Sequence, residues 1–134
     1  MPIMRKKAEE NLSAAKLLID NSMFSSSVHC SYYAGFQFSK HVLAICCGID
    51  YANQENESRG KDSHYYVTSC LEKNLLNRSY RIAMADYNTY YSKLKRLRKK
   101  ADYLQDAISS KEADNAYDCA DKMITLLKNK YSLS

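Results

Sequence analysis

The sequence predicts an all-α protein, an up-and-down bundle of four to five helices. Glycine and proline together make only 4 of the 134 residues, which leaves few residues for the turns of a sheet. Isoleucine, valine and threonine, which strands favour, number only 13. Apolar residues instead recur at helical spacing along most of the chain. A chain of this length supports one core, so we expect a single domain over residues 1–134.

The first helix is expected from about Pro2 to about Asn21, because proline is favoured in a first helical turn. One face of this segment is apolar and carries Ala8, Leu12, Ala15 and Ile19. The second helix is expected from about Ser26 to Cys47, with Gly48 as its stop. Its apolar arc covers more than half of the circumference, so we expect either the central helix of the bundle or part of a subunit interface.

A polar segment separates this pair from the remaining helices. Residues Ile49 to Asp62 are rich in Asn, Glu, Ser and Gly, and we expect them to form a loop. The third helix is expected from about Ser63 to Asn77, and the fourth from about Ser79 to Gln105. The fourth carries an apolar stripe of Tyr87, Tyr91, Leu94, Leu97, Ala101 and Leu104. The fifth helix follows Ser109, which forms a capping-box pattern with Glu112.

Cysteine usage and net charge indicate the cellular compartment of the protein and the kind of partner it can bind. The five cysteines are odd in number and lack a C-x-x-C pair, so we expect reduced thiols in a cytoplasmic protein. No apolar run approaches the roughly 18 residues of a membrane span, and the first residues lack the apolar stretch of a secretory signal. A net charge of +5 is compatible with an anionic partner. The sequence has no metal-ligand cluster and no phosphate-binding loop, so we expect neither a metal nor a cofactor.

Residues 93–100, KLKRLRKK, form the most basic segment of the chain. On a helix, Arg98 falls on the apolar side together with Tyr91 and Asp102. One interpretation is a partly buried ion pair between Arg98 and Asp102 that fixes packing, and the other is a ligand site. The outer cations are Lys93, Lys95, Arg96, Lys99 and Lys100. They either solvate the helix or bind phosphate groups.

The sequence contains 12 tyrosines, several of them in adjacent pairs such as Tyr32 and Tyr33. Adjacent helical residues point about 100° apart, so each pair is expected to have one inward and one outward ring. Such rings either complete the core or stack on bases. The three histidines, His29, His41 and His64, form no catalytic or metal-binding spacing in the sequence.

Three segments carry a resemblance to a known family. The sequence SVHCSYYAGFQFSKHVL, residues 27–43, resembles the second helix of HEPN domains. The sequence LRKKADY, residues 97–103, resembles the arginine motif of one HEPN branch, in which L-R-x-x-A-D-Y-like sequences recur. The opening AEENLSAAKLLIDNSMFSSSV, residues 8–28, fits the first helix and turn of the same branch. The likeness covers roughly residues 7–128.

The resemblance implies a helical bundle that commonly dimerises, so that the arginine motifs of two subunits meet in one cleft. It also implies an RNA-cleaving toxin or a defence effector, frequently accompanied by a nucleotidyltransferase-like partner. Catalytic members of the family place a histidine about a turn and a half after the arginine, whereas residues 99–105 read KKADYLQ. Asp102 is a poor substitute, because beside Arg98 and Lys99 it is expected to stay ionised near pH 7.

We therefore expect a HEPN-like homodimer without catalysis that binds RNA, a nucleotide or a protein partner in a cleft lined by Arg98, Asp102 and Tyr103. Further candidate binding residues are Tyr32, Tyr33, Lys95, Arg96, Lys99 and Lys100. One alternative is a metal-independent ribonuclease toxin that uses Arg98 with Asp102, Tyr103 or a histidine from elsewhere in the chain. Another alternative is a structural subunit whose second helix docks a companion protein.

Overall fold

The computed structural model describes residues 2–134 and contains six helices and no strand in that part of the chain. The helices are α1 (Ile3–Asp20), α2 (Phe24–Cys46), α3 (Tyr51–Ser58), α4 (Ser63–Asn77), α5 (Arg81–Tyr103) and α6 (Ser110–Lys130). The predicted all-α bundle is therefore confirmed. None of the described helices is both long enough and apolar enough to cross a membrane.

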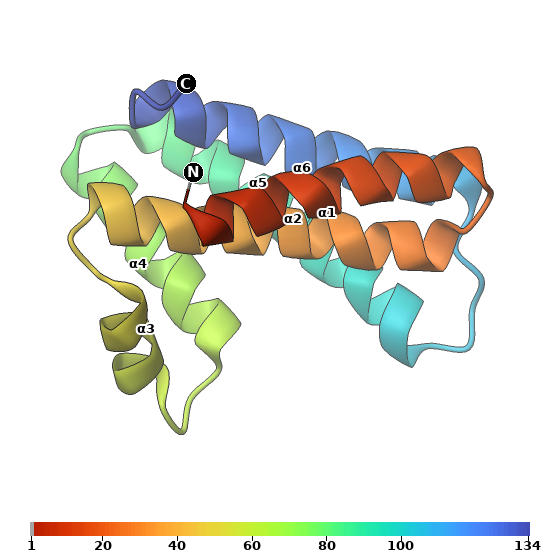
Figure 1. Ribbon diagram of the computed structural model, residues 1–134, viewed down its shortest axis with the longest axis horizontal. Coiled ribbons are helices and arrows are strands. Elements are labelled where there is room, and N and C mark those ends of the chain that lie inside the picture. The colour runs from red at the N-terminus through yellow and green to blue at the C-terminus, as the bar shows by residue number, and fades with distance from the viewer. Residues whose placement is uncertain (1) are drawn as a thin grey trace.

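The second helix, α2, is the centre of the bundle. It packs against α1, α4, α5 and α6, and most of its residues are buried. Figure 1 shows α1 and α2 side by side and antiparallel, with α6 behind them and the α3–α4 region projecting at one end. Neighbours on several sides explain the wide apolar arc of α2 within one chain, apart from the exposed Ile45.

Gly35 allows α6 to pack closely against α2. A Cβ atom built on Gly35 would lie 2.7 Å from the Sδ of Met123, which is buried in α6. Any larger side chain would push the two helices apart or displace Met123. Hydrogen bonds within the core add to this packing, because the Oγ of Ser39 in α2 lies 2.8 Å from the hydroxyl of Tyr87 in α5.

Two helix ends follow their sequence signals. The Oγ of Ser109 accepts a hydrogen bond from the backbone N–H of Glu112, and the carboxylate of Glu112 accepts one from the backbone N–H of Ser109. This reciprocal pair is the predicted capping box at the start of α6. At the end of α2, Gly48 has a φ of 70°, a left-handed conformation that favours glycine.

Two predictions about helix limits were wrong. The expected loop Ile49 to Asp62 contains α3, which the carboxylate of Asp50 caps by accepting from the backbone N–H of Asn53. Only two residues of α3 are buried, so the segment lacks the apolar stripe by which helices are recognised. The expected helix Ser79 to Gln105 is shorter at both ends, and Leu104 caps α5 with its side chain exposed instead of continuing the apolar stripe.

Candidate functional site

Arg98 lies on α5 where this helix faces α2, and its side chain is 20% exposed. Its Nε donates a hydrogen bond of 3.2 Å to the Oδ2 of Asp102, one turn later on the same helix. This contact is the predicted ion pair. The same guanidinium also contacts several aromatic rings, so the pair is one part of a larger cluster.

Three tyrosines surround the guanidinium of Arg98. Its Nη2 lies 3.2 Å from the hydroxyl of Tyr33 and 3.4 Å from the hydroxyl of Tyr103. The ring of Tyr32 lies below the guanidinium, with its centroid 4.8 Å from Cζ. Such stacking on a π face attracts the cation and fixes the plane of its donors. The predicted candidates Arg98, Asp102, Tyr103, Tyr32 and Tyr33 therefore come together in the structure.

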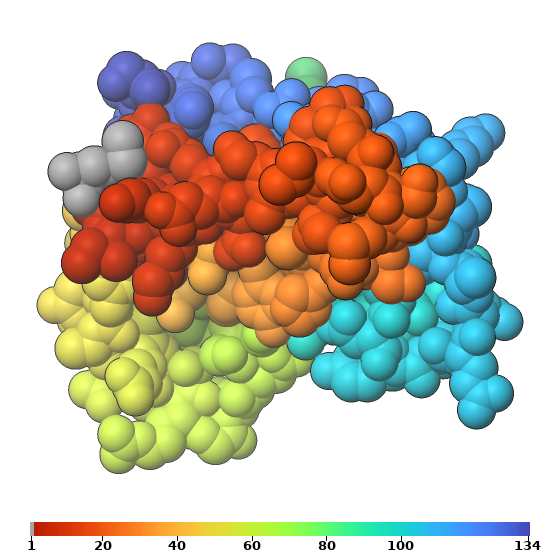
Figure 2. All heavy atoms as spheres, turned by 45° about the vertical axis from the view of Figure 1, so that its right-hand side comes forward, coloured from red at the N-terminus to blue at the C-terminus, as the bar shows by residue number. Residues whose placement is uncertain are grey.

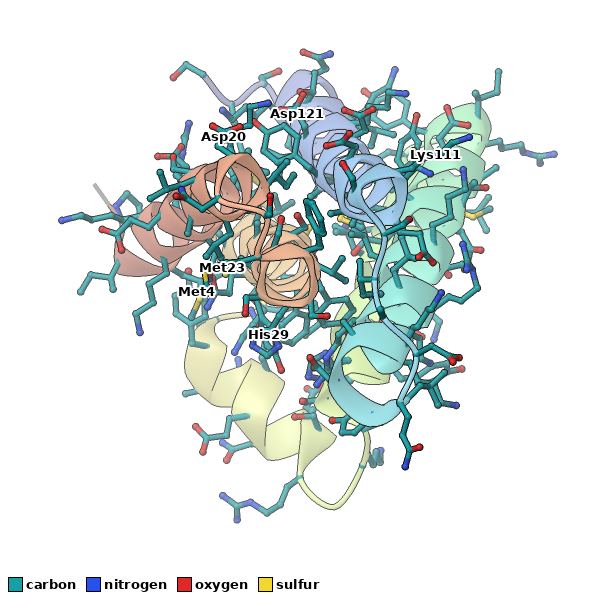
Figure 3. All side chains as sticks on the ribbon, turned by 90° about the vertical axis from the view of Figure 1, so that its right-hand side faces the viewer. Met4, Asp20, Met23, His29, Lys111 and Asp121 are labelled. Atoms are coloured by element: carbon teal, nitrogen blue, oxygen red, sulfur yellow. The ribbon has the colours of Figure 1, made fainter. Side chains whose placement is uncertain are left out.

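A histidine from α2 joins this group. The Nδ1 of His29 lies 3.1 Å from the Oδ2 of Asp102, and its ring lies 4.8 Å from that of Tyr33 between centroids. Figure 3 shows His29 on the side of α2 that faces away from α1. Because Asp102 occupies Nδ1, the Nε2 of His29 is the ring nitrogen left for a ligand.

A second histidine enters from the first turn of α4. The Nδ1 of His64 lies 2.5 Å from the hydroxyl of Tyr32. Its ring lies flat on that of Phe36, with 4.1 Å between centroids and 6° between planes. Burial lowers the pKa of His64, and the positive charge of Arg98 lowers it further. The imidazole of His64 is therefore held in place and kept neutral near pH 7.

Hydroxyl groups connect His64 to the interior. The hydroxyl of Tyr32 lies 3.1 Å from that of Tyr91, which belongs to α5. Burial raises the pKa of both phenols, so both keep their protons. The result is a chain of proton-bearing groups that runs from the core to the imidazole of His64.

These residues meet where α2, α4 and α5 come together, and we refer to them as the Arg98 cluster. Its members are His29, Tyr32, Tyr33, His64, Tyr91, Arg98, Asp102 and Tyr103. Figure 2 shows the surface hollowed below α2, between the α3–α4 region and the C-terminal end of α5. The cluster combines a fixed cation with two imidazoles and several hydroxyl groups.

In the basic segment of α5, some side chains are exposed to solvent and others pack against neighbouring helices. Lys95, Arg96 and Lys99 are exposed, as the helical projection predicts. Lys100 instead forms an ion pair with Glu112 of α6 at 2.9 Å and is 27% exposed. The interpretation of Lys100 as a freely solvated cation was wrong, because the start of α6 folds back over the end of α5. Lys100 stabilises this helix contact.

His41 lies away from the Arg98 cluster. It is 2% exposed on α2, and its Nδ1 has no hydrogen-bond partner in the described part of the chain. Burial lowers the pKa of His41, and the charge of Arg5 in α1 lowers it further. Of the three histidines, His29 and His64 belong to the Arg98 cluster, and no catalytic or metal-binding motif in the sequence indicated this. Helical periodicity on α2 could have found His29, because it lies one turn before Tyr33, a predicted cleft residue.

The chain was compared with known proteins and with models of protein families. No protein-family model matches the chain. A protein of Methanocaldococcus jannaschii, named "Putative toxin MJ0605", is 29% identical over 121 residues. The match covers 90% of this chain and 81% of the archaeal protein. The chain is thus similar over most of its length to a protein named as a toxin.

Proposed function

We propose that this protein is a toxin of the HEPN type that cleaves RNA without a metal ion, using the Arg98 cluster. The observation that carries the proposal is the convergence of His29 and His64, from two other helices, on the arginine motif. The centroid of each imidazole lies within 6 Å of the centroid of the Tyr33 ring. Arg98 donates a hydrogen bond to the hydroxyl of the same tyrosine. In this proposal, His29 and His64 take the role of the histidine that is missing after Arg98.

Arg98 supplies the site for the scissile phosphate. Its guanidinium is always charged and presents donors in a plane, which suits the oxygens of a phosphodiester. The ring of Tyr32 stacks on one face of the guanidinium, and Asp102 accepts a hydrogen bond from its Nε. A fixed donor of this kind stabilises the additional negative charge on phosphorus in the transition state.

His64 is placed to act as the general base. The Nδ1 of His64 is hydrogen-bonded to the hydroxyl of Tyr32, and that hydroxyl is hydrogen-bonded to Tyr91. In the proposed mechanism Nδ1 carries the proton of this imidazole, which leaves the lone pair on Nε2. The lowered pKa of His64 keeps this lone pair unprotonated at neutral pH. Nε2 takes the proton of the ribose 2′-hydroxyl as its oxygen attacks phosphorus.

His29 is placed to act as the general acid. Asp102 orients its ring through Nδ1 and balances the charge of the protonated form. The Nε2–H of His29 gives its proton to the 5′-oxygen as the bond from phosphorus to that oxygen breaks. The products are a 2′,3′-cyclic phosphate and a 5′-hydroxyl end, and the reaction needs no metal ion.

Two further observations support a toxin of this class. The archaeal relative is named as a toxin, and the match extends over most of both chains. The all-helical bundle and the LRKKADY motif on α5 agree with the HEPN resemblance. A homodimer and a nucleotidyltransferase-like partner, both implied by that resemblance, stay predictions of this proposal.

The experiment is incubation of the purified protein with single-stranded RNA in excess chelator. We expect cleavage to ends that carry 2′,3′-cyclic phosphate, which labelling and mass spectrometry identify. Arg98→Ala should reduce the rate by about 100-fold or more, because a fixed donor to the transition-state charge is lost. Arg81→Ala is the matched control, since Arg81 is exposed at the opposite end of α5.

The same assay separates cleavage from binding alone. Retention of RNA by the wild-type protein without any cleavage would contradict the proposal and favour the non-catalytic module. Cleavage that persists in Arg98→Ala, or that disappears when chelator is added, would also contradict it. Induced expression in a bacterial host gives a second readout, since growth should stop with the wild-type protein and continue with Arg98→Ala.

A further inference from the structure

A cavity outside the Arg98 cluster lies between α2, α3 and α4. Its volume is about 270 Å³, slightly below the usual range of roughly 300 to 1,000 Å³ for sites of drug-sized ligands. Phe36 and Lys40 of α2, Tyr51 and Gln54 of α3, and Ser63 of α4 line it. The cavity has room for a ligand the size of a single planar base.

Gln54, which lines this cavity, has a hydrogen-bond acceptor without a partner. The Nε2 of Gln54 donates to the backbone oxygens of Lys40 at 3.1 Å and of Ile49 at 2.9 Å. Both amide protons are therefore used, and the orientation of the amide group is fixed. Its Oε1 is buried and has no hydrogen-bond partner in the described part of the chain. A buried acceptor without a partner is uncommon in proteins and favours a ligand that donates a hydrogen bond.

The remaining lining suits a nucleotide. Tyr51 offers a ring against which a base can stack, and Phe36, one face of which is covered by His64, adds an apolar wall. The Nζ of Lys40 lies 5.7 Å from the centroid of Phe36, so a cation lies beside this ring. Glu55, also in the lining, accepts hydrogen bonds as Gln54 does, which again favours a ligand with donor groups.

Phe36 joins this cavity to the Arg98 cluster. The same ring lines the cavity and stacks on His64. Ser63, which lines the cavity, directly precedes His64 in the chain. The cavity therefore lies next to His64, one of the residues of the Arg98 cluster.

We propose that this cavity binds a nucleobase with an exocyclic amino group, which donates to the Oε1 of Gln54. The inference rests on the proposed function, because it assigns the base of the nucleotide whose phosphate lies at the Arg98 cluster. Cytosine and uracil have the same shape, but cytosine carries an amino group where uracil carries a carbonyl oxygen. Uracil would place that oxygen against Oε1, with no proton between two acceptors.

The test compares binding of cytidine and uridine 5′-monophosphate to the wild-type protein by calorimetry. We expect cytidine monophosphate to bind about tenfold more tightly, because one hydrogen bond to a buried acceptor is made or lost. Gln54→Leu should remove the preference. Because Gln54 also holds the backbone of α2 and of the segment before α3, folding of this variant is checked by circular dichroism. Ser63→Phe places a ring in the cavity from an exposed position. This variant should block binding of both nucleotides while Gln54 itself is not substituted.

A second arm identifies the source of the base. Non-cleavable 2′-deoxy oligonucleotides with a single cytosine or uracil report binding of a nucleic acid, and free nucleotides report binding of a small ligand. A preference for cytosine in either arm supports the inference. Equal binding of the two pyrimidines in both arms, or no effect of Ser63→Phe, would overturn it. If the pyrimidines are discriminated but RNA is never cleaved, the base site stands and the proposed catalysis fails.

Discussion

The Oδ2 of Asp102 lies 3.1 Å from the Nδ1 of His29 and also accepts from the Nε of Arg98 at 3.2 Å. One carboxylate on α5 therefore orients a histidine of α2 and the arginine of its own helix. Its side chain is 21% exposed, so solvent only partly screens these contacts. The proposed acid and the proposed phosphate site depend on the same group.

Asp102→Asn keeps the shape of this side chain and removes its charge. We expect the kcat of RNA cleavage to fall about tenfold or more, with a smaller change in KM, because the acid is no longer oriented. Steady-state kinetics on a short RNA measures both constants. A change in KM alone would show that Asp102 serves only to bind the substrate.

Tyr32→Phe removes the hydroxyl that holds His64 and leaves the ring beneath Arg98. Tyr32 is a positioning residue, and we expect kcat to fall because Nε2 of His64 is no longer aimed at the 2′-hydroxyl. The acid limb of the pH–rate profile should also move, since one hydrogen bond to the imidazole is lost. Tyr65→Phe, at an exposed position on α4, is the control and should leave both the rate and the profile unchanged.

The buried His41 makes stability depend on pH. Burial and the charge of Arg5 lower its pKa, while Glu9 acts in the opposite direction. Below the ordinary pKa of about 6.5 the unfolded chain binds a proton at His41 that the folded chain does not. Stability is therefore expected to fall as the pH decreases from about 6.5, by at most about 1.4 kcal/mol per pH unit for this group.

Urea denaturation between pH 7.5 and pH 5 measures this dependence. His41→Leu should flatten the curve, because the unfolded chain then has one fewer group to protonate. His64, whose pKa is also lowered, contributes the same sign and leaves a residual slope in this variant. An unchanged slope in His41→Leu would show that His41 is not responsible.

Ser109→Ala removes the side chain that caps α6. We expect the free energy of unfolding to decrease by about 1 kcal/mol, as is usual when a serine cap is lost. The neighbouring exposed Ser110 provides the matched control, and Ser110→Ala should change stability by less than about 0.5 kcal/mol. Equal effects of the two substitutions would indicate that the capping box contributes nothing specific.

Local patterns were sufficient to predict the long helices. Apolar periodicity predicted α1, α2, α4, α5 and α6, and the pattern of Ser109 and Glu112 predicted the start of α6. These signals are local, because periodicity and caps depend on residues within a few turns. The short α3 has too little buried surface to show such a pattern.

The site could be predicted only in part. Periodicity placed Arg98 on the inner side of its helix, next to Asp102, since these residues are one turn apart. The partners His29 and Asp102 are 73 residues apart, and their contact depends on how α2 packs against α5. The free Oε1 of Gln54 depends in the same way on hydrogen bonds that form only in the folded chain.

The most direct measurement compares His64→Ala and His29→Ala on two substrates, an RNA dinucleotide and a nucleoside 3′-phosphate ester of p-nitrophenol. Each variant should cleave the dinucleotide at a rate at least about 100-fold below that of the wild-type protein. The nitrophenolate leaves without a proton, so His29→Ala should regain activity on the ester, whereas His64→Ala should not. Full activity of both variants on the dinucleotide would contradict the account, as would equal losses on both substrates.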